Sequence, residues 1–314
     1  MISKRDLHLF WTKIPLLSDY IISLRQSRPV LVLSFWRCGS SWVGAVVGRA
    51  ETAHYLSEPV CKSLHSTSHR LFAECDEQIA TTIKDVFTKA PRLGPPWLPF
   101  PSSWRIDRVP RGTLVIKEIV LLFTAELLRC QPRVILLRRH PVAVAKSFLA
   151  SGIFGPGRQK LVLLAPYGDR LDQSTPLTLA VSLYGYFLTR ALAALDGYKD
   201  CLRISFEEMC SDPVAGFKDI FSFAKLPFTD SSVKMIRRLS SKDEPSRKSI
   251  CRKSSDMPGR QLQGISALEI SQLREVWERF DLPWYRGDKD WVVTTEESST
   301  HKPDQLSGSD ISAL

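Results

Sequence analysis

Short apolar runs, separated by stretches with helical spacing, dominate the pattern of this 314-residue chain. The runs are bounded by charged or small residues, which is typical of strands that are buried on both faces of a parallel sheet. They predict strands at 30–33, 53–56, 112–118, 133–138 and 201–204.

Apolar positions at helical spacing alternate with these strands. They predict helices after the first strand and after Pro141, and then at 177–195, 213–224, 230–240 and 266–280. Alternating strands and helices form a parallel sheet that is covered on both faces. The predicted fold class is therefore α/β, a P-loop-like open parallel β-sheet flanked by helices on both faces. We expect a single domain over 1–293 and a disordered Ser/Thr/acid-rich tail over 294–314.

Three stretches are predicted to be additions to the central α/β domain. Residues 7–24 mix apolar and polar side chains, which favours a surface helix on the core over a peripheral membrane contact. Residues 91–110 hold six prolines and three large aromatics, and 151–178 is rich in glycine and proline. The first of these is either an aromatic-lined loop over a bound acceptor or a crossover that covers the sheet. The second is a long loop and a second candidate for acceptor binding. No apolar run is long enough to span a membrane, and no signal-peptide pattern is present.

Composition narrows the class of ligand and the compartment. Lys and Arg total 43 against 33 acids, a net charge of +10, which favours an anionic ligand. The cations do not form blocks interleaved with aromatic residues, so no nucleic-acid partner is expected. The seven cysteines form no CxxC pair and no metal-ligand spacing with the histidines. They predict free thiols in a reducing compartment, hence a cytoplasmic protein without a metal site.

The turn after the first strand is the most informative part of the chain. Residues 34–42 read Ser-Phe-Trp-Arg-Cys-Gly-Ser-Ser-Trp, between an apolar strand and an apolar helix. A glycine and small hydroxyl residues at a helix start present backbone N–H groups to an anion. A Walker A loop would need Gly at position 34 and Lys at position 40, where this chain has Ser34 and Ser40. The cation here is Arg37, upstream of the glycine, which argues against ATP or GTP.

Two further strands end in cations. The 112–118 run reaches Lys117, and the 133–138 run is followed by Arg139. Ligands of open parallel sheets bind outside the carboxyl ends of the strands, so Arg37, Lys117 and Arg139 are expected at one edge. A Mg²⁺-dependent phosphoryl-transfer enzyme would place a metal-binding acid there. These residues instead predict an anionic ligand that is held by side-chain cations.

These residues resemble a known family in three places. The run 37–44, Arg-Cys-Gly-Ser-Ser-Trp-Val-Gly, with Glu58-Pro59 after it, is similar to the 5′-phosphosulfate loop of sulfotransferases, in particular the bacterial and carbohydrate-type branch. The run 139–147, Arg-His-Pro-Val-Ala-Val-Ala-Lys-Ser, resembles the 3′-phosphate motif of that family. The run 204–213 resembles a later motif, with Phe206 in place of a tyrosine. The three matches occur in the family order.

The resemblance implies a cosubstrate and a set of binding residues. The cosubstrate is 3′-phosphoadenosine 5′-phosphosulfate (PAPS), which transfers its sulfuryl group in line to a hydroxyl acceptor without a metal ion. The acceptor class is a carbohydrate, a glycolipid or a small metabolite, and the oligomeric state stays open. The residues implied to bind the cosubstrate are Arg37, Cys38, Gly39, Ser40, Ser41, Trp42, Arg139, Ser147, Arg252, Lys253 and Arg260.

Some of these residues have simpler interpretations. Trp42 would either stack on the adenine or belong to the core. At Cys38 a requirement for a small side chain is favoured over a redox switch. Arg252, Lys253 and Arg260 lie in a polar segment where charges are usually solvated. The glycine that the family has after the Arg-Lys pair is Ser254 here.

The catalytic residues implied are Arg37, Lys117 and Glu58. The cytosolic branch of the family uses a histidine two positions after the strand lysine, where this chain has Ile119. In the carbohydrate-type branch the glutamate after the loop acts as the base, which corresponds to Glu58. Glu118 is the competitor, although strand alternation turns it away from Lys117. Because Pro59 follows, we expect an extended backbone at Glu58.

Two other classes of function remain as alternatives. A P-loop small-molecule kinase would require Mg²⁺-dependent turnover of ATP. A catalytically silent nucleotide-binding or nucleic-acid-binding protein would bind its ligand without transfer. The sulfotransferase interpretation predicts metal-independent transfer, stabilised by the cations and by the loop N–H groups.

Overall fold

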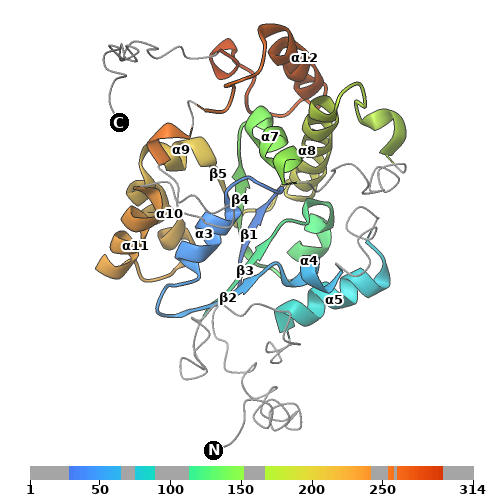
Figure 1. The fold of residues 1–314 in the computed structure, drawn as a ribbon. Helices are drawn as coiled ribbons and strands as arrows, with labels where there is room; N and C mark the ends of the chain where they lie inside the picture. Colours follow the sequence, from blue (N-terminus) through green and yellow to red (C-terminus); the bar gives the residue numbers. More distant parts are fainter. Residues whose placement is uncertain are drawn as a thin grey trace, which may run out of the picture.

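The computed structural model describes residues 28–64, 75–88, 113–151, 167–241, 254–257 and 260–292. Its centre is a five-stranded sheet in which every pairing is parallel (Figure 1). The spatial order is β2–β3–β1–β4–β5, so β2 and β3 lie on one side of β1, and β4 and β5 lie on the other side. The strands are β1 (Val30–Ser34), β2 (Ala53–Ser57), β3 (Thr113–Glu118), β4 (Arg133–Arg138) and β5 (Cys201–Ser205).

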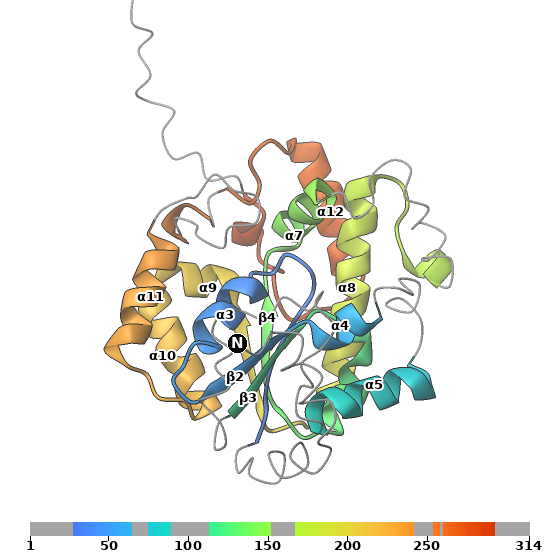
Figure 2. The same ribbon diagram turned by 60° about the horizontal axis from the view of Figure 1, so that its bottom comes forward.

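Helices cover both faces of the sheet. In Figures 1 and 2, α3, α10 and α11 lie against one face, and α4, α5 and α8 lie on the other side. The α-helices are α3 (Ser40–Val47), α4 (Pro59–Ser63), α5 (Glu77–Thr88), α6 (Thr124–Leu128), α7 (Pro141–Ala150), α8 (Pro176–Ala194), α9 (Phe206–Ser211), α10 (Pro213–Ala224), α11 (Asp230–Ser240) and α12 (Ala267–Glu278). Short 3₁₀ turns are η3 (Leu121–Phe123), η5 (Ser254–Asp256) and η6 (Asp288–Asp290).

Two of the three inner strands form the centre of the core. All residues of β1 and β3 are buried, because helices pack on both faces of these strands. Val30 of β1 aligns with Val115 of β3 and with Arg133 of β4. This register brings the carboxyl ends of the strands to one edge of the sheet, and the loops that follow them therefore meet there.

One helix among the described residues, α8, has the length and apolar composition of a membrane-spanning helix. More than half of it is buried inside the protein, where it packs against α7 and α12. An apolar helix enclosed in this way serves as a core element. Its start is fixed by a capping box, in which Thr175 and Thr178 each accept a bond from the other's backbone N–H.

The structure confirms the predicted α/β class and the predicted strands. It adds short elements that hydrophobic spacing did not reveal, namely α4, α6 and α9, and the longer α5. The proposed surface helix at 7–24, the segment 91–110 and the tail 294–314 lie outside the described residues, as does 152–166 of the second proline- and glycine-rich stretch.

Candidate active site

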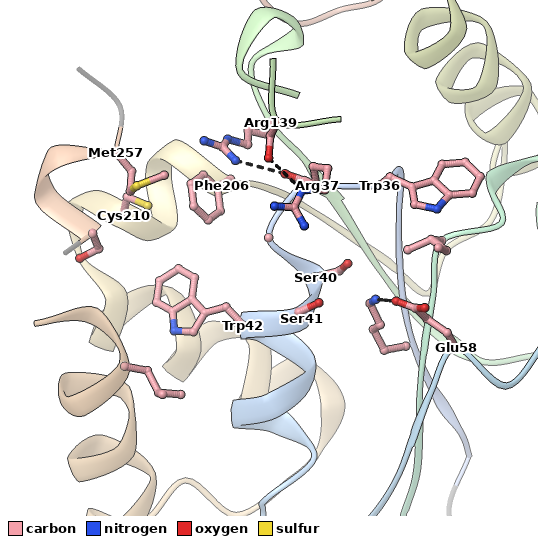
Figure 3. A pocket seen from close by; sticks show the side chains of 16 residues that line it. Trp36, Arg37, Ser40, Ser41, Trp42, Glu58, Arg139, Phe206, Cys210 and Met257 are labelled. Carbon is pink, nitrogen blue, oxygen red and sulfur yellow. Dashed lines mark hydrogen bonds and ion pairs between the residues drawn. The ribbon is translucent and has the colours of Figure 1, made fainter. Parts of the chain in front are cut away.

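A pocket of about 510 Å³ opens at the carboxyl edge of the sheet, where the loops after all five strands meet. Its size is ordinary for a small-molecule site. Figure 3 shows an order along it: Trp42, Phe206, Cys210 and Met257 on one side, Arg37, Ser40 and Ser41 in the middle, and Trp36 and Glu58 on the other side. The remaining lining residues are Gly39, Lys117, Ile119, Arg139, Ser147, Leu239 and Ser254.

The middle of the pocket is the turn between β1 and α3. Arg37 and Gly39 have φ values of 68° and 92°, so the chain reverses sharply before α3 begins at Ser40. A side chain at position 39 would place Cβ 2.4 Å from the ring of Phe206, so only glycine fits. Gly39 has no side chain to cap the helix. No side chain of the N-cap residue therefore covers the N–H groups in the first turn of α3, where the sequence predicts an anion.

Three of the predicted anion-binding residues are joined directly. The Arg37 Nε donates to Ser147 Oγ at 2.8 Å, and Arg139 Nη1 donates to the Arg37 carbonyl oxygen at 3.1 Å. The Arg139 backbone is held in turn by the hydroxyl of Tyr184, which bonds both its N–H and its C=O at 3.2 Å. The structure thus groups Arg37 with Ser147 and Arg139, which supplies two guanidinium groups beside the start of α3.

Lys117 and Glu58 form an ion pair at the other end of the pocket (Figure 3). The Lys117 side chain is 2% exposed and that of Glu58 is 26% exposed, so the cation is buried while the carboxylate reaches the pocket. A buried lysine requires a counter-charge, because removing an ammonium from water is costly. Glu58 supplies that charge.

The backbone of Glu58 contradicts the expectation from Pro59. Glu58 has φ 54° and ψ 47°, a left-handed conformation and not the extended one that precedes most prolines. Two hydrogen bonds hold it: its N–H donates to the Lys117 carbonyl at 2.7 Å, and its carbonyl accepts from Lys62 N–H at 2.9 Å. Tertiary contacts with β3 and α4 therefore override the local preference.

Glu118, the competing candidate for the base, faces away from the pocket. Its side chain is fully buried, and its two carboxylate oxygens accept from the N–H groups of Val60 at 2.6 Å and Cys61 at 3.4 Å. Burial raises the pKa of Glu118 to about 8, although these two N–H groups act in the opposite direction. The alternation predicted for β3 is confirmed, since Lys117 and Glu118 point to opposite sides.

The apolar side of the pocket is built from rings. Trp42 packs edge-on against Phe206 at 6.0 Å and against Phe217 at 5.1 Å between centroids. Arg139 lies over the Phe206 ring at 4.6 Å. The indole N–H of Trp42 is buried without a hydrogen-bond partner in the described part of the chain, so packing alone sets the ring position. Trp42 both joins the core, at 7% exposure, and lines the pocket.

Cys38 does not reach the pocket. Its thiol is buried in the core beside Tyr184, and only its backbone belongs to the loop. Burial raises the pKa of Cys38 to about 12, so the thiol stays protonated. The requirement for a small side chain explains this position better than a redox switch does.

The predicted basic segment is only partly visible. Arg252 and Lys253 lie outside the described residues. Arg260 forms an ion pair with Asp256 at 3.1 Å and is not among the residues that line the pocket. Two neighbours in this segment, Ser254 and Met257, do line it.

Several lining residues were not predicted to belong to the site. Phe206 follows β5 directly, so the rule that ligands meet strand ends could have found it. Cys210, Leu239 and Met257 come from α9, α11 and the turn after η5, and no local signal marks them. Within the described part of the chain, no group of three or more His, Cys, Asp or Glu side chains is arranged to hold a metal ion.

The fold is α/β, and its pocket lies at the carboxyl edge of a parallel sheet, beside a glycine-containing turn at the start of α3. Residues 27–266, well over half of the chain, match the family model described as "Sulfotransferase domain". The chain therefore belongs to the sulfotransferase family, and its class of reaction is sulfuryl transfer. No curated protein matches the sequence significantly.

Solved structures of sulfotransferases are similar to this chain at low sequence identity. The sulfotransferase domain from the curacin biosynthetic pathway is 16% identical, with 82% of this chain and 98% of that chain covered and a TM-score of 0.48. Sulfotransferase STF9 from Mycobacterium avium is 14% identical, with coverages of 87% and 80% and a TM-score of 0.47. Mouse sulfotransferase SULT7A1, complexed with PAP, is 14% identical, with coverages of 87% and 91% and a TM-score of 0.49.

Proposed function

We propose that this protein transfers the sulfuryl group of PAPS to a hydroxyl acceptor, with Glu58 as the general base. One observation carries the proposal: the pocket presents aromatic rings, then an anion-binding turn with two arginines, then a lysine–glutamate pair. The groups of PAPS and its acceptor have the same order: the adenine, the phosphates, the sulfuryl group and then the acceptor hydroxyl.

The residues present suit a nucleotide with a 3′-phosphate and a 5′-phosphosulfate. The first turn of α3 offers backbone N–H groups to one anionic group, and Gly39 lets the chain approach it closely. The cluster of Arg37, Ser147 and Arg139 suits a second anionic group, since guanidinium groups match the geometry of phosphate oxygens. Trp42 and Phe206 offer apolar surface to a purine.

The Lys117–Glu58 pair supplies the chemistry that the chain itself contributes. Bound PAPS supplies a sulfuryl group on a phosphosulfate bond, and adenosine 3′,5′-bisphosphate is the leaving product. Glu58 takes the proton from the acceptor hydroxyl as the new O–S bond forms. Lys117 turns from Glu58 to the bridging oxygen, where negative charge grows as the S–O bond breaks. The fixed turn holds both reactants in line.

The reaction is proposed to need no metal ion. In a Mg²⁺-dependent enzyme the metal neutralises charge on the transferred group. Here Arg37, Lys117 and Arg139 supply positive charge at three strand ends. A sulfuryl group carries less charge than a phosphoryl group, so side-chain cations suffice.

The acceptor end of the pocket is bounded by Trp36, Ile119 and Glu58. An indole beside a carboxylate suits a hydroxyl on a sugar ring, a glycolipid or a small metabolite, because rings of each kind pack on aromatic faces. The carbohydrate-type assignment of the base is part of this proposal, since Ile119 occupies the position of the histidine base of the cytosolic branch.

The test is transfer of label from PAPS labelled with ³⁵S to panels of sugars, glycolipids and phenols, with and without excess EDTA. We expect a sulfated product and an equal amount of adenosine 3′,5′-bisphosphate under both conditions. Lys117→Ala should lower both turnover and PAPS affinity, because the substitution removes a cation. Two results would refute the proposal: loss of transfer on chelation with recovery on adding Mg²⁺, or a phosphorylated product formed from ATP in place of a sulfated product from PAPS.

A further inference from the structure

Glu118 occupies an unusual place for a buried carboxyl group. It is the last residue of β3, its side chain is fully buried, and its oxygens accept from Val60 and Cys61 at the start of α4. The sheet thus caps this helix through a side chain from a different element. The pocket lining does not include Glu118, so the reaction does not use it directly.

This cap replaces one that Glu58 would otherwise provide. Glu58 is the N-cap residue of α4, yet its own side chain makes no capping hydrogen bond. N-cap side chains normally bond the N–H groups two or three positions ahead, which here belong to Val60 and Cys61. Glu118 accepts hydrogen bonds from both of these N–H groups. Pro59, which lies between Glu58 and Val60, has no N–H to offer. The Glu58 carboxylate is therefore released to face Lys117 and the pocket.

The same contacts stabilise the strained backbone of Glu58. Its left-handed conformation persists only where neighbouring structure over-determines it. The Lys117 carbonyl holds the residue from one side, and Glu118 holds the two residues that follow Pro59. Because strand neighbours alternate, β3 places Lys117 on the pocket side of this turn and Glu118 on its other side.

We infer that Glu118 is a positioning residue for the general base: it fixes the direction of the Glu58 carboxylate by capping α4 in its place. The inference rests on the proposed function, in which Glu58 accepts the acceptor proton. Glu118 acts through Glu58 alone and contacts neither cosubstrate nor acceptor. Substitution of Glu118 therefore affects kcat and leaves PAPS binding intact.

The test is a double-mutant cycle of Glu118→Gln and Glu58→Gln, with kcat and the PAPS KM measured for each variant. The amide keeps the shape of Glu118 but cannot accept from both N–H groups. Glu118→Gln should lower kcat by about 10-fold or more with the PAPS KM within about twofold. In the Glu58→Gln background it should change kcat by less than about twofold, because residues that act as a unit are non-additive.

Ser266→Ala is the matched control, since Ser266 caps α12 through Glu269 N–H far along the chain from Glu58. It should lower Tm by a similar amount without changing kcat. If Glu118→Gln does not fold, Glu118→Asp keeps the acceptor chemistry with a shorter reach and should show the same selective loss of kcat.

Unchanged kcat in Glu118→Gln, or a full multiplicative loss in the double variant, would overturn the positioning role while the proposed function stands. A Glu58→Gln enzyme with full turnover would overturn it as well and would show that Glu58 is not the base. A wild-type protein that transfers no sulfuryl group would contradict the proposed function, and the positioning role with it.

Discussion

Residues with a strained backbone form part of this site. Arg37, Gly39 and Glu58 all have positive φ values, and all three line the pocket. Each such non-glycine residue costs about 1–3 kcal/mol and persists where the surrounding structure fixes it. The sequence indicated the need for Gly39. It could not indicate the backbone of Arg37 or Glu58, because both residues are held by bonds to residues far along the chain.

Gly39→Ala is predicted to combine two penalties. The left-handed backbone costs about 1–2 kcal/mol for a residue with a Cβ, and the crowding against Phe206 adds about 1–3 kcal/mol. The displaced turn should also weaken adenosine 3′,5′-bisphosphate binding by at least about 10-fold, since the N–H groups of α3 move with it. Calorimetry measures the affinity and denaturant unfolding measures the stability.

Gly197→Ala is the control for the backbone penalty alone. Gly197 has φ 67°, and a Cβ there would meet nothing within 4 Å. It should lose only the first 1–2 kcal/mol or so and bind the nucleotide normally. Equal binding by both variants would contradict the role assigned to the turn.

At the scale of elements, strand ends were predictable and their partners were not. The apolar runs place Arg37, Lys117 and Arg139 correctly at one edge, because a parallel sheet has only one carboxyl edge. Apart from Trp42 of α3, the apolar side comes from α9, α11 and the turn after η5, which meet only in the folded chain. The Glu118 cap on α4 is likewise a contact between elements that no local pattern reveals.

His140 joins the turn after β4 to the segment after α12. Its Nδ1 accepts from Val142 N–H, so Nε2 carries the proton that is donated to the Asp290 carbonyl at 2.8 Å. The ring also packs on Tyr285 and Trp291. Burial lowers the pKa of His140 to about 4, against the opposing charge of Glu207. The neutral imidazole therefore connects these elements beside Arg139.

Because His140 is buried in its neutral form, we predict that the protein loses stability in acid. The unfolded chain binds a proton at His140 near its ordinary pKa of 6.5, whereas the folded chain does so near 4. The neutral His140 therefore contributes its full stabilisation above pH 6.5. The free energy of unfolding falls as the pH drops from 6.5 to about 4, by at most about 1.4 kcal/mol per pH unit. Urea unfolding at several pH values should show this slope in the wild type and a shallower one in His140→Gln. Identical slopes would refute the assignment.

At the scale of the whole molecule, fold class and family agree with the sequence prediction. The sheet and its two helical layers follow from local patterns of apolar and polar residues, and the three motifs can be read directly from the sequence. The acceptor does not follow from them, because it is set by the far end of the pocket. The metal independence, the cytoplasmic location and the lack of a nucleic-acid partner stay predictions, based on cations at strand ends and on cysteine and charge patterns.

A net charge of +10 suits an enzyme whose cosubstrate is a polyanion. Positive potential around a cleft raises the local concentration of anions and speeds their association. This long-range attraction does not discriminate between nucleotides. Discrimination must come from the contacts of Arg139 and Ser147, which belong to the motif that is expected to bind the 3′-phosphate.

The most direct test of the central claim is therefore calorimetric titration with adenosine 3′,5′-bisphosphate and with adenosine 5′-phosphate, which lacks only the 3′-phosphate, alongside ATP. We predict a micromolar Kd for the bisphosphate, at least about 10-fold weaker binding of the other two nucleotides, and a Tm rise of about 5 °C at saturation with the bisphosphate. Arg139→Gln should abolish most of the preference. Equal affinity for the bisphosphate and ATP, or a preference that survives in Arg139→Gln, would contradict the account.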